Sequence, residues 1–156
     1  MTVTIRTYEA RDAEVVWALH LEGVRDGRAD HPELDYAGHE EDLRDIESAY
    51  LSPGSNFWVA EVDGLLVGMA AIQRIDAETG RLRRMRVTDA WRRRGVAAGL
   101  LKTAEEFCRG RGYKRVILDT TKQQQAAQQL YERAAYVRTG DRMLGPFTLY
   151  DYEKVL

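Results

Sequence analysis

The residues best suited to chemistry lie in a short basic segment that separates two apolar runs. Arg92, Arg93 and Arg94 are followed by Gly95, and the small or apolar residues Val96, Ala97 and Ala98 come next, where the spacing becomes helical. The first turn of a helix presents unpaired backbone N–H groups and the positive end of the helix dipole. Small residues there let a phosphate approach the backbone, so the segment is predicted to bind a phosphate or pyrophosphate. It contains neither the GxxxxGK[ST] of a P-loop nor the GxGxxG of a dinucleotide fold.

Charge is distributed unevenly along the chain. Its 156 residues include 23 Lys and Arg and 25 Asp and Glu, for a formal net charge of −2. Residues 1–80 hold six arginines, no lysine and 17 acidic residues, whereas residues 81–156 hold 17 basic and eight acidic residues. A basic half favours an anionic ligand and an acidic half a cationic one, but two solvated surfaces would give the same segregation. The nearly neutral total argues against nucleic-acid binding, which the arginine cluster alone would suggest.

The remaining composition limits the class of protein. The longest apolar run, Leu65 to Ile72, has eight residues, whereas a membrane span needs about 20. The first residues lack the basic and apolar pattern of a signal peptide. A single cysteine, Cys108, excludes an internal disulfide and a cysteine-based zinc site, and three scattered histidines lack metal-ligand spacing. We therefore expect one cytoplasmic domain over residues 1–156, with no metal, no membrane contact and Cys108 in the core.

Hydrophobic periodicity predicts the elements that position the basic segment. We expect strands over residues 3–8, 57–62, 65–75, 81–87, 116–118, 136–139 and 147–155, and helices over 13–24, 39–50, 96–108 and 123–134. Asp63-Gly64 predicts a hairpin, because both residues tolerate positive φ. Leu82 lies three residues before Met85 where strict alternation needs two or four, which predicts a β-bulge unless Leu82 is exposed. This order gives an α/β fold with a mixed sheet flanked by helices.

Two motifs in these elements resemble those of a known family. Arg92-x-x-Gly95-x-Ala97 resembles the Q/R-x-x-G-x-G/A signature of the GNAT superfamily of acyl-CoA-dependent N-acyltransferases. Ala127-x-x-Leu130-Tyr131-Glu132-x-x-x-Tyr136 is similar to the family's A-x-x-L-Y-E-x-x-G-F/Y motif. The resemblance extends over essentially the whole chain and is tightest from about Arg81 to Gly140. It implies a mostly antiparallel sheet of about seven strands and about four helices, with two parallel strands splayed around the pantetheine arm of the cofactor.

The resemblance also implies a co-substrate, acetyl-CoA, and the residues that contact it. The backbone of Met85, Arg86 and Val87 is expected to pair with pantetheine, and the bulge to free an N–H for the thioester oxygen. Further contacts are implied for Arg92, Arg93, Arg94, Gly95, Val96, Ala97, Ala98, Gln124 and Tyr131. Gln124 stands where the family often has Asn, and Ala135 replaces the usual glycine before the final aromatic residue.

The reaction implied by the resemblance is direct attack of a primary amine of a small molecule or peptide on the acetyl thioester. The amine must first lose a proton, and the departing thiolate benefits from an acid. Tyr131 matches the family's frequent acid, with a packing role as the alternative. Arg81 replaces a common catalytic Glu and cannot accept a proton at neutral pH. Other members of the family use an acidic residue in the strand before the tyrosine helix, where Asp119 stands, so the resemblance implies Asp119 as the base; the alternative is a strand-end carboxylate that caps nearby backbone or pairs with a lysine. His31, His39 and Glu40 are further candidates that would act through water.

Two expectations about partners remain. The resemblance implies that the region between the first two predicted helices forms one wall of the acceptor cleft. Acidic residues are concentrated there, which favours a cationic amine: Asp26, Asp30, Glu33, Asp35, Glu40 and Glu41. A homodimer is an expected assembly, whereas nucleic acid is not an expected partner. The competing function is a catalytically silent acyl-CoA-binding regulatory module on the same fold, since Arg81 and Gln124 depart from the family's usual residues.

Overall fold

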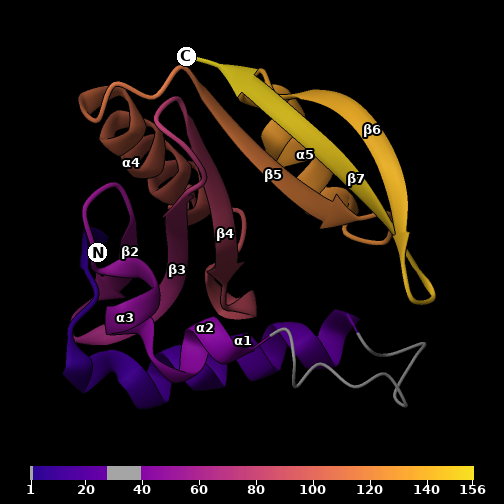
Figure 1. Ribbon diagram of the computed structural model, residues 1–156. Helices are drawn as coiled ribbons and strands as arrows, with labels where there is room; N and C mark the ends of the chain where they lie inside the picture. The colour runs from indigo at the N-terminus through magenta and orange to yellow at the C-terminus, as the bar shows by residue number, and fades with distance from the viewer. Residues whose placement is uncertain (1, 28–39) are drawn as a thin grey trace.

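The computed structural model describes residues 2–27 and 40–156, and in them seven strands form one sheet in the order β1-β2-β3-β4-β5-β7-β6 (Figure 1). The strands are β1 (Thr4–Thr7), β2 (Asn56–Val62), β3 (Leu65–Arg74), β4 (Thr79–Val87), β5 (Arg115–Thr121), β6 (Val137–Leu144) and β7 (Phe147–Val155). The helices are α1 (Ala13–Gly27), α2 (Glu41–Arg44), α3 (Ile46–Tyr50), α4 (Val96–Gly110) and α5 (Gln125–Arg133). All neighbouring strands are antiparallel except β4 and β5. The predicted mixed, mostly antiparallel sheet is confirmed.

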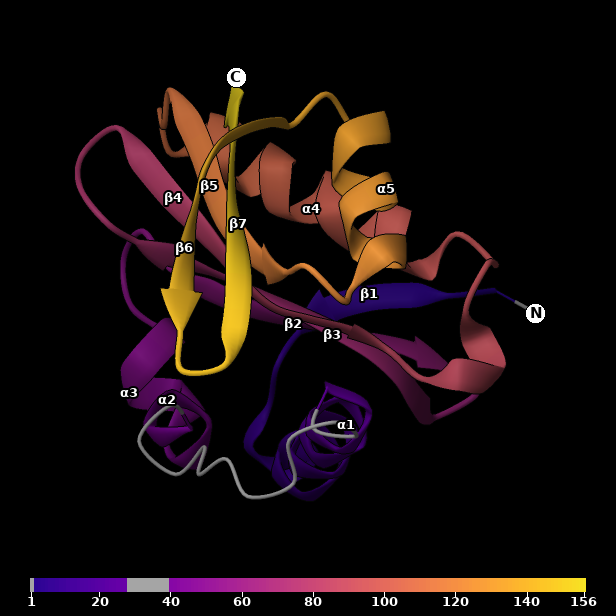
Figure 2. The ribbon, with the colours of Figure 1, turned by 90° about the vertical axis from the view of Figure 1, so that its right-hand side faces the viewer.

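The sheet separates two layers of helices. Helices α4 and α5 cover one face, and α1, α2 and α3 cover the other (Figure 2). Leu100 of α4 and Val116 of β5 belong to the apolar cluster on the first face, and Val16 of α1 and Phe57 of β2 to that on the second. Cys108 is fully buried in the first cluster, as predicted, and burial raises the pKa of its thiol to about 12. Among the helices in the described segments, none is long and apolar enough to cross a membrane.

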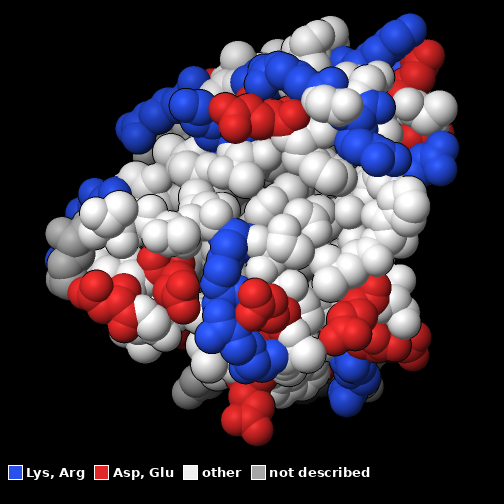
Figure 3. Space-filling model, turned by 90° about the vertical axis from the view of Figure 1, so that its left-hand side faces the viewer, with Lys and Arg blue, Asp and Glu red and all other residues white. Residues whose placement is uncertain are grey.

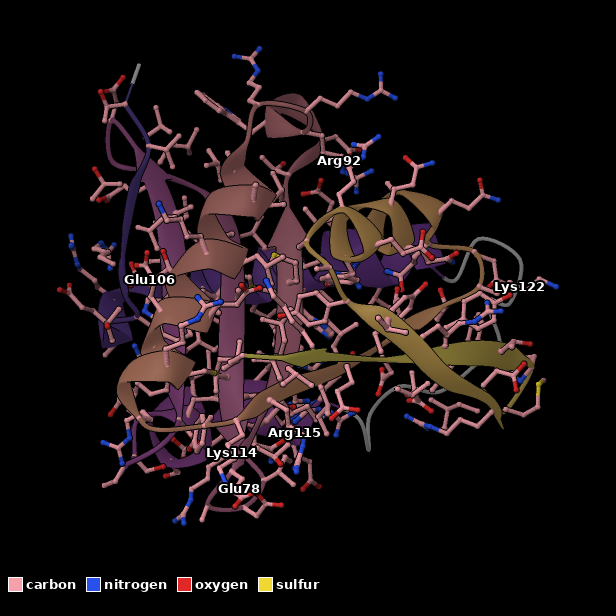
Figure 4. All side chains as sticks on the ribbon, turned by 90° about the horizontal axis from the view of Figure 1, so that it is seen from above. Glu78, Arg92, Glu106, Lys114, Arg115 and Lys122 are labelled. Carbon is pink, nitrogen blue, oxygen red and sulfur yellow. The ribbon has the colours of Figure 1, made fainter. Side chains whose placement is uncertain are left out.

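The parallel strands β4 and β5 are paired at one end only. Their register runs from Thr79 opposite Arg115 to Arg81 opposite Ile117 and stops there. Ion pairs from Glu78 to Lys114 (3.2 Å) and to Arg115 (3.6 Å) hold the joined end together. Figure 4 shows these three side chains grouped together, whereas Arg92 and Lys122, which follow the other ends of the two strands, lie far apart. The splayed pair implied by the family resemblance is therefore present.

Strand β4 contains the predicted bulge. Arg83 pairs with Ala71 and Arg86 with Met69, so three steps along β4 match two along β3. The backbone accommodates the additional residue at Arg84, whose φ is +59°. The bulge keeps Leu82, Met85 and Val87 in contact with the apolar cluster under α4.

Two predicted elements differ from the structure. Within the described part of segment 39–50, the single helix is wrong: α2 and α3 are separated at Asp45, whose φ of −148° is not helical and whose carboxylate accepts the Ser48 N–H at 3.2 Å. An aspartate that caps a new helix interrupts the apolar spacing only locally, so periodicity did not reveal it. Strand β6 extends to Leu144, beyond the predicted end at residue 139. The prediction missed this extension because the strand is exposed along its whole length and carries no alternating pattern. The Asp63-Gly64 hairpin is confirmed, with φ of +49° and +80°.

Candidate active site

A pocket of about 160 Å³ lies where β4 and β5 diverge. It is lined from both layers of helices, by His20 of α1 on one face of the sheet and by Tyr131 of α5 on the other. Five residues predicted for the site lie together in its wall: Met85, Arg86, Asp119, Gln124 and Tyr131. Val87 and Arg92 instead line a small adjoining hollow, which they share with Arg86.

The start of α4 has the geometry of an anion site. Gly95 precedes the helix with φ of +81°, and no side chain caps the first turn. A Cβ placed on Gly95 would meet no atom within 4 Å, so the backbone N–H groups beyond it face open space. Arg93 has φ of +62°, and Arg93, Arg94 and Ala98 are exposed. Val96 is buried and Ala97 is half-buried, which leaves the N–H groups of this turn and nearby guanidiniums to hold a pyrophosphate.

Two arginines of this loop are fixed by local contacts. The Arg92 guanidinium lies 3.1 Å from Asp89, and the Arg94 guanidinium stacks 4.9 Å from the centre of the Trp91 ring. Both contacts involve exposed or half-buried side chains and leave the cations near the start of α4.

Tyr131 is buried, with 5% of its surface exposed, and it contacts two other tyrosine rings. Its ring centre lies 5.8 Å from that of Tyr136 and 6.3 Å from that of Tyr152. The other two hydroxyls donate hydrogen bonds, Tyr136 to Glu105 at 3.0 Å and Tyr152 to Glu132 at 3.1 Å. Among the described residues the Tyr131 hydroxyl has no such partner, which is uncommon for a buried polar group. Burial raises the pKa of the Tyr131 phenol, so the group is protonated at neutral pH.

The carboxylate of Asp119 is held by two arginines. Its Oδ2 lies 2.7 Å from Nη2 of Arg81 and 2.9 Å from Nη2 of Arg142. Asp119 is therefore ion-paired, with Arg81 and Arg142 as partners in place of the expected lysine. A role for Asp119 as the base stays a prediction.

Gln124 and Ala135, the two residues that depart from the family motifs, have defined local contacts. The Gln124 Oε1 accepts hydrogen bonds from the Thr120 hydroxyl at 3.0 Å and from the Thr121 N–H at 3.1 Å, so its amide nitrogen is the part left for a ligand. Ala135 has φ of +74° at the end of α5, where the N–H of Tyr136 donates to the carbonyl of Tyr131 at 2.9 Å. This left-handed turn is the conformation that glycine adopts most easily.

Sequence reasoning missed the polar residues packed between the sheet and helices α1 and α2, of which His20 and Arg84 line the pocket. His20 lines the pocket, and its Nε2 lies 2.9 Å from Oε1 of Glu40. The Arg84 guanidinium contacts both carboxylate oxygens of Asp42, at 2.6 and 3.0 Å, and the hydroxyl of Tyr50 donates to the same carboxylate. The available signal was that His20 follows the apolar Val16 by one helical turn and therefore faces the core.

Gly23 was missed for a different reason. A Cβ at Gly23 would lie 2.1 Å from Nε of Arg86, so the absence of a side chain makes room for the Arg86 guanidinium against α1. A glycine inside a helix usually weakens it, and only the tertiary contact explains this one.

The described lining of the pocket is more basic than acidic. Glu40 is buried against His20, Glu41 is exposed, and the pocket is lined by Arg83, Arg84 and Arg86 with one carboxylate, that of Asp119. The other predicted positions fall outside what the structure describes: His31, His39, Asp30, Glu33, Asp35 and the side chain of Asp26. The charge of the two sequence halves is partly neutralised by pairs between them, such as those of Glu78, and Figure 3 shows basic and acidic residues side by side on one face.

Metal binding was not expected from the sequence. Within residues 2–27 and 40–156, no group of three or more His, Cys, Asp or Glu side chains is placed to hold a metal ion.

Comparisons with known proteins agree with this geometry. The sequence profile of the Acetyltransferase (GNAT) family matches residues 21–136. N-acetylaspartate synthetase of Danio rerio is 43% identical over 110 residues, which are 69% of this chain and 39% of that protein, so the chain spans about two fifths of this relative. The fold is similar to that of an acetyltransferase from Streptococcus agalactiae, with a TM-score of 0.84, 22% identity and coverage of 99% and 98% of the two chains. PaiA N-acetyltransferase from Thermoplasma acidophilum, solved in complex with coenzyme A, aligns with a TM-score of 0.79 and 17% identity over 100% of both chains. With its splayed parallel strands and open helix start, the chain belongs to the GNAT family of acetyltransferases.

Proposed function

We propose that the chain transfers an acetyl group from acetyl-CoA to a primary amine of a small molecule or peptide, by direct attack while both substrates are bound. The observation that carries the proposal is the buried Tyr131 hydroxyl, which lines the pocket without a hydrogen-bond partner among the described residues. A pocket lined from both faces of the sheet supports simultaneous binding of a donor and an acceptor.

The residues of β4 and α4 fit the donor. The N–H groups at the start of α4 would hold the pyrophosphate, because this turn is uncapped and open. Met85 has no register partner in β3 at the bulge, and β5 has already diverged, so its backbone groups are available to pantetheine and to the thioester oxygen. When bound, acetyl-CoA supplies the activated acetyl group. Tyr131 would supply the proton that the departing sulfur takes, since its phenol is protonated at neutral pH.

The described acceptor side favours an amine that also carries a carboxylate. Arg83 and Arg86 line the pocket on the α1 face, and guanidinium groups recognise carboxylates by paired hydrogen bonds. The name of the Danio rerio relative, N-acetylaspartate synthetase, is consistent with such an acceptor for that protein. We therefore propose amino acids before polyamines as acceptors of this chain, in contrast to the cationic acceptors that the sequence charge suggested.

The alternative is an acyl-CoA-binding module without turnover, which the ion-paired Asp119 and the Arg81 substitution favour. Free-thiol release from acetyl-CoA, measured with amino acids, polyamines, aminoglycosides and N-terminal peptides, separates the two. We expect acceptor-dependent release that is fastest with amino acids, and a reaction without acceptor gives the hydrolysis background. Absence of thiol release with every amine, combined with measurable acetyl-CoA binding, would establish the binding module instead.

A further inference from the structure

His20 and Glu40 form a buried polar pair on the α1 side of the pocket. His20 is 4% exposed and Glu40 is 8% exposed, and His20 Nε2 lies 2.9 Å from Glu40 Oε1. The imidazole also packs against the Trp17 ring, with centres 5.4 Å apart. Burying two polar side chains is unfavourable unless they are paired, and His20 in addition lines the pocket.

The partner determines which nitrogen of His20 can accept a proton. An ionised carboxylate only accepts hydrogen bonds, so the Nε2 atom facing Glu40 carries the hydrogen and Nδ1 carries the lone pair in the neutral ring. Among the described residues, none is hydrogen-bonded to Nδ1. Burial lowers the pKa of His20; the Glu40 hydrogen bond and charge oppose this shift, and the charges of Arg84 and Arg86 add to it. The imidazole is therefore neutral at neutral pH, which is the form that accepts a proton.

Of the described residues that line the pocket, His20 and Asp119 are the two that can accept a proton at neutral pH. The Asp119 Oδ2 already accepts from Arg81 and Arg142. We propose that His20 takes the proton that the acceptor ammonium must lose, and that Glu40 is a positioning residue that holds the imidazole in the required tautomer. The inference rests on the proposed acetyl transfer and deepens it, because it assigns the base that the sequence left open.

The acceptor nitrogen loses two protons in the reaction. One proton passes from the acceptor R–NH3+ to Nδ1 of His20, and the freed lone pair forms the C–N bond. The C–S bond breaks and its electron pair remains on sulfur, which takes a proton from Tyr131. A second N–H proton leaves the nitrogen as the amide forms and restores the Tyr131 phenol. The products are the N-acetyl amide, the free thiol of coenzyme A and one proton, which His20 releases to solvent.

The test uses His20→Gln, which keeps an amide donor toward Glu40 but cannot titrate. With the preferred amino acid as acceptor, kcat/KM should fall by about 10²-fold at neutral pH, within the range for loss of a general base. Methoxyamine is already a free amine at this pH, so its rate should fall by less than about threefold. Acetyl-CoA binding, measured by calorimetry, should not change. A merely structural role would slow both acceptors equally.

The pH profile gives a second readout. In the wild-type chain kcat/KM should fall on acidification with a midpoint below about 6.5, the ordinary pKa of histidine. Glu40→Gln removes the carboxylate that raises the pKa of His20, so this midpoint should move to lower pH. Tyr113→Phe is the matched control, because it removes a buried hydrogen bond to the Gly54 carbonyl (2.6 Å) without touching the pocket. Its profile should equal that of the wild-type chain.

The outcomes separate this inference from the proposed function. Wild-type turnover by His20→Gln, or an equal loss with both acceptors, overturns the role of His20 and leaves acetyl transfer standing. If His20→Gln does not fold, an unshifted midpoint in Glu40→Gln overturns the role instead. Absence of turnover by the wild-type chain with every amine overturns the proposed function and this inference together.

Discussion

Replacing Tyr131 by phenylalanine should make the protein more stable and less active at once. The substitution keeps the ring and its contacts with Tyr136 and Tyr152 and removes only the hydroxyl. A buried polar group without a partner costs about 1–3 kcal/mol, so its removal should raise the free energy of unfolding by about 1 kcal/mol. For a chain of this length that corresponds to roughly 2–4 °C in the melting temperature.

The neighbouring tyrosine provides the matched comparison. Tyr136→Phe removes an equally buried hydroxyl that donates to Glu105, a carboxylate that is itself 6% exposed. Hydrogen bonds to charged groups contribute about 1.5–3 kcal/mol, so this variant should lose stability of that order. Two chemically identical changes on rings 5.8 Å apart are therefore expected to have opposite signs.

The activity measurement completes the test. Loss of the proton donor should lower kcat by about 10²-fold, equivalent to about 2.7 kcal/mol of activation free energy, while acetyl-CoA binding persists. Urea or thermal unfolding and the thiol-release assay are run on the same preparations. A Tyr131→Phe variant that is destabilised like Tyr136→Phe would show that the hydroxyl has a partner. Wild-type turnover by Tyr131→Phe would show that Tyr131 has a packing role and does not donate the proton.

Three further changes test other parts of the site. Ala135→Gly should raise the free energy of unfolding by about 0.5–1 kcal/mol in urea titrations, because relief of left-handed strain (about 1–2 kcal/mol) exceeds the entropic cost of glycine (about 0.5–1 kcal/mol). Ala126→Gly, in the right-handed helix α5, should instead lower the free energy of unfolding. Gly95→Val should abolish acetyl-CoA binding in calorimetry while the circular dichroism spectrum stays native, and retained affinity would contradict the assignment of the start of α4 as the donor site. Gly23→Ala should displace the Arg86 guanidinium and raise the acceptor KM with little change in melting temperature or donor affinity, whereas an unchanged KM would exclude Arg86 from acceptor binding.

The parts of the fold that sequence predicts best depend on neighbouring residues. The Asp63-Gly64 hairpin, the start of α4 at Gly95 and the bulge signalled by Leu82 and Met85 each arise from backbone preferences or apolar spacing within a few positions. Such patterns report which side of an element is buried, and the element order followed from them.

The polar part of the site could not be predicted in the same way. His20 and Glu40 are 20 residues apart, Arg81 and Asp119 are 38 apart, and Asp42 and Arg84 are 42 apart. Whether such a residue is buried depends on a partner that only the assembled fold brings near, since an unpaired charge would remain in water. The predicted acidic wall stays a prediction, because four of its six positions, among them Asp30 and Glu33, lie outside the described side chains.

The bulge at Arg84 separates what the fold needs from what the site needs in the length of the gene. Deleting one codon between those for Leu82 and Met85 would leave these two residues two positions apart, so Leu82, Met85 and Val87 would keep their contacts with the cluster under α4. Strand β4 would then pair with β3 without interruption, and the backbone of Met85 would face Ala70 of β3 instead of the donor. A relative that lacks one residue here is therefore expected to keep the fold and to lose the opening between β4 and β5 that binds the donor.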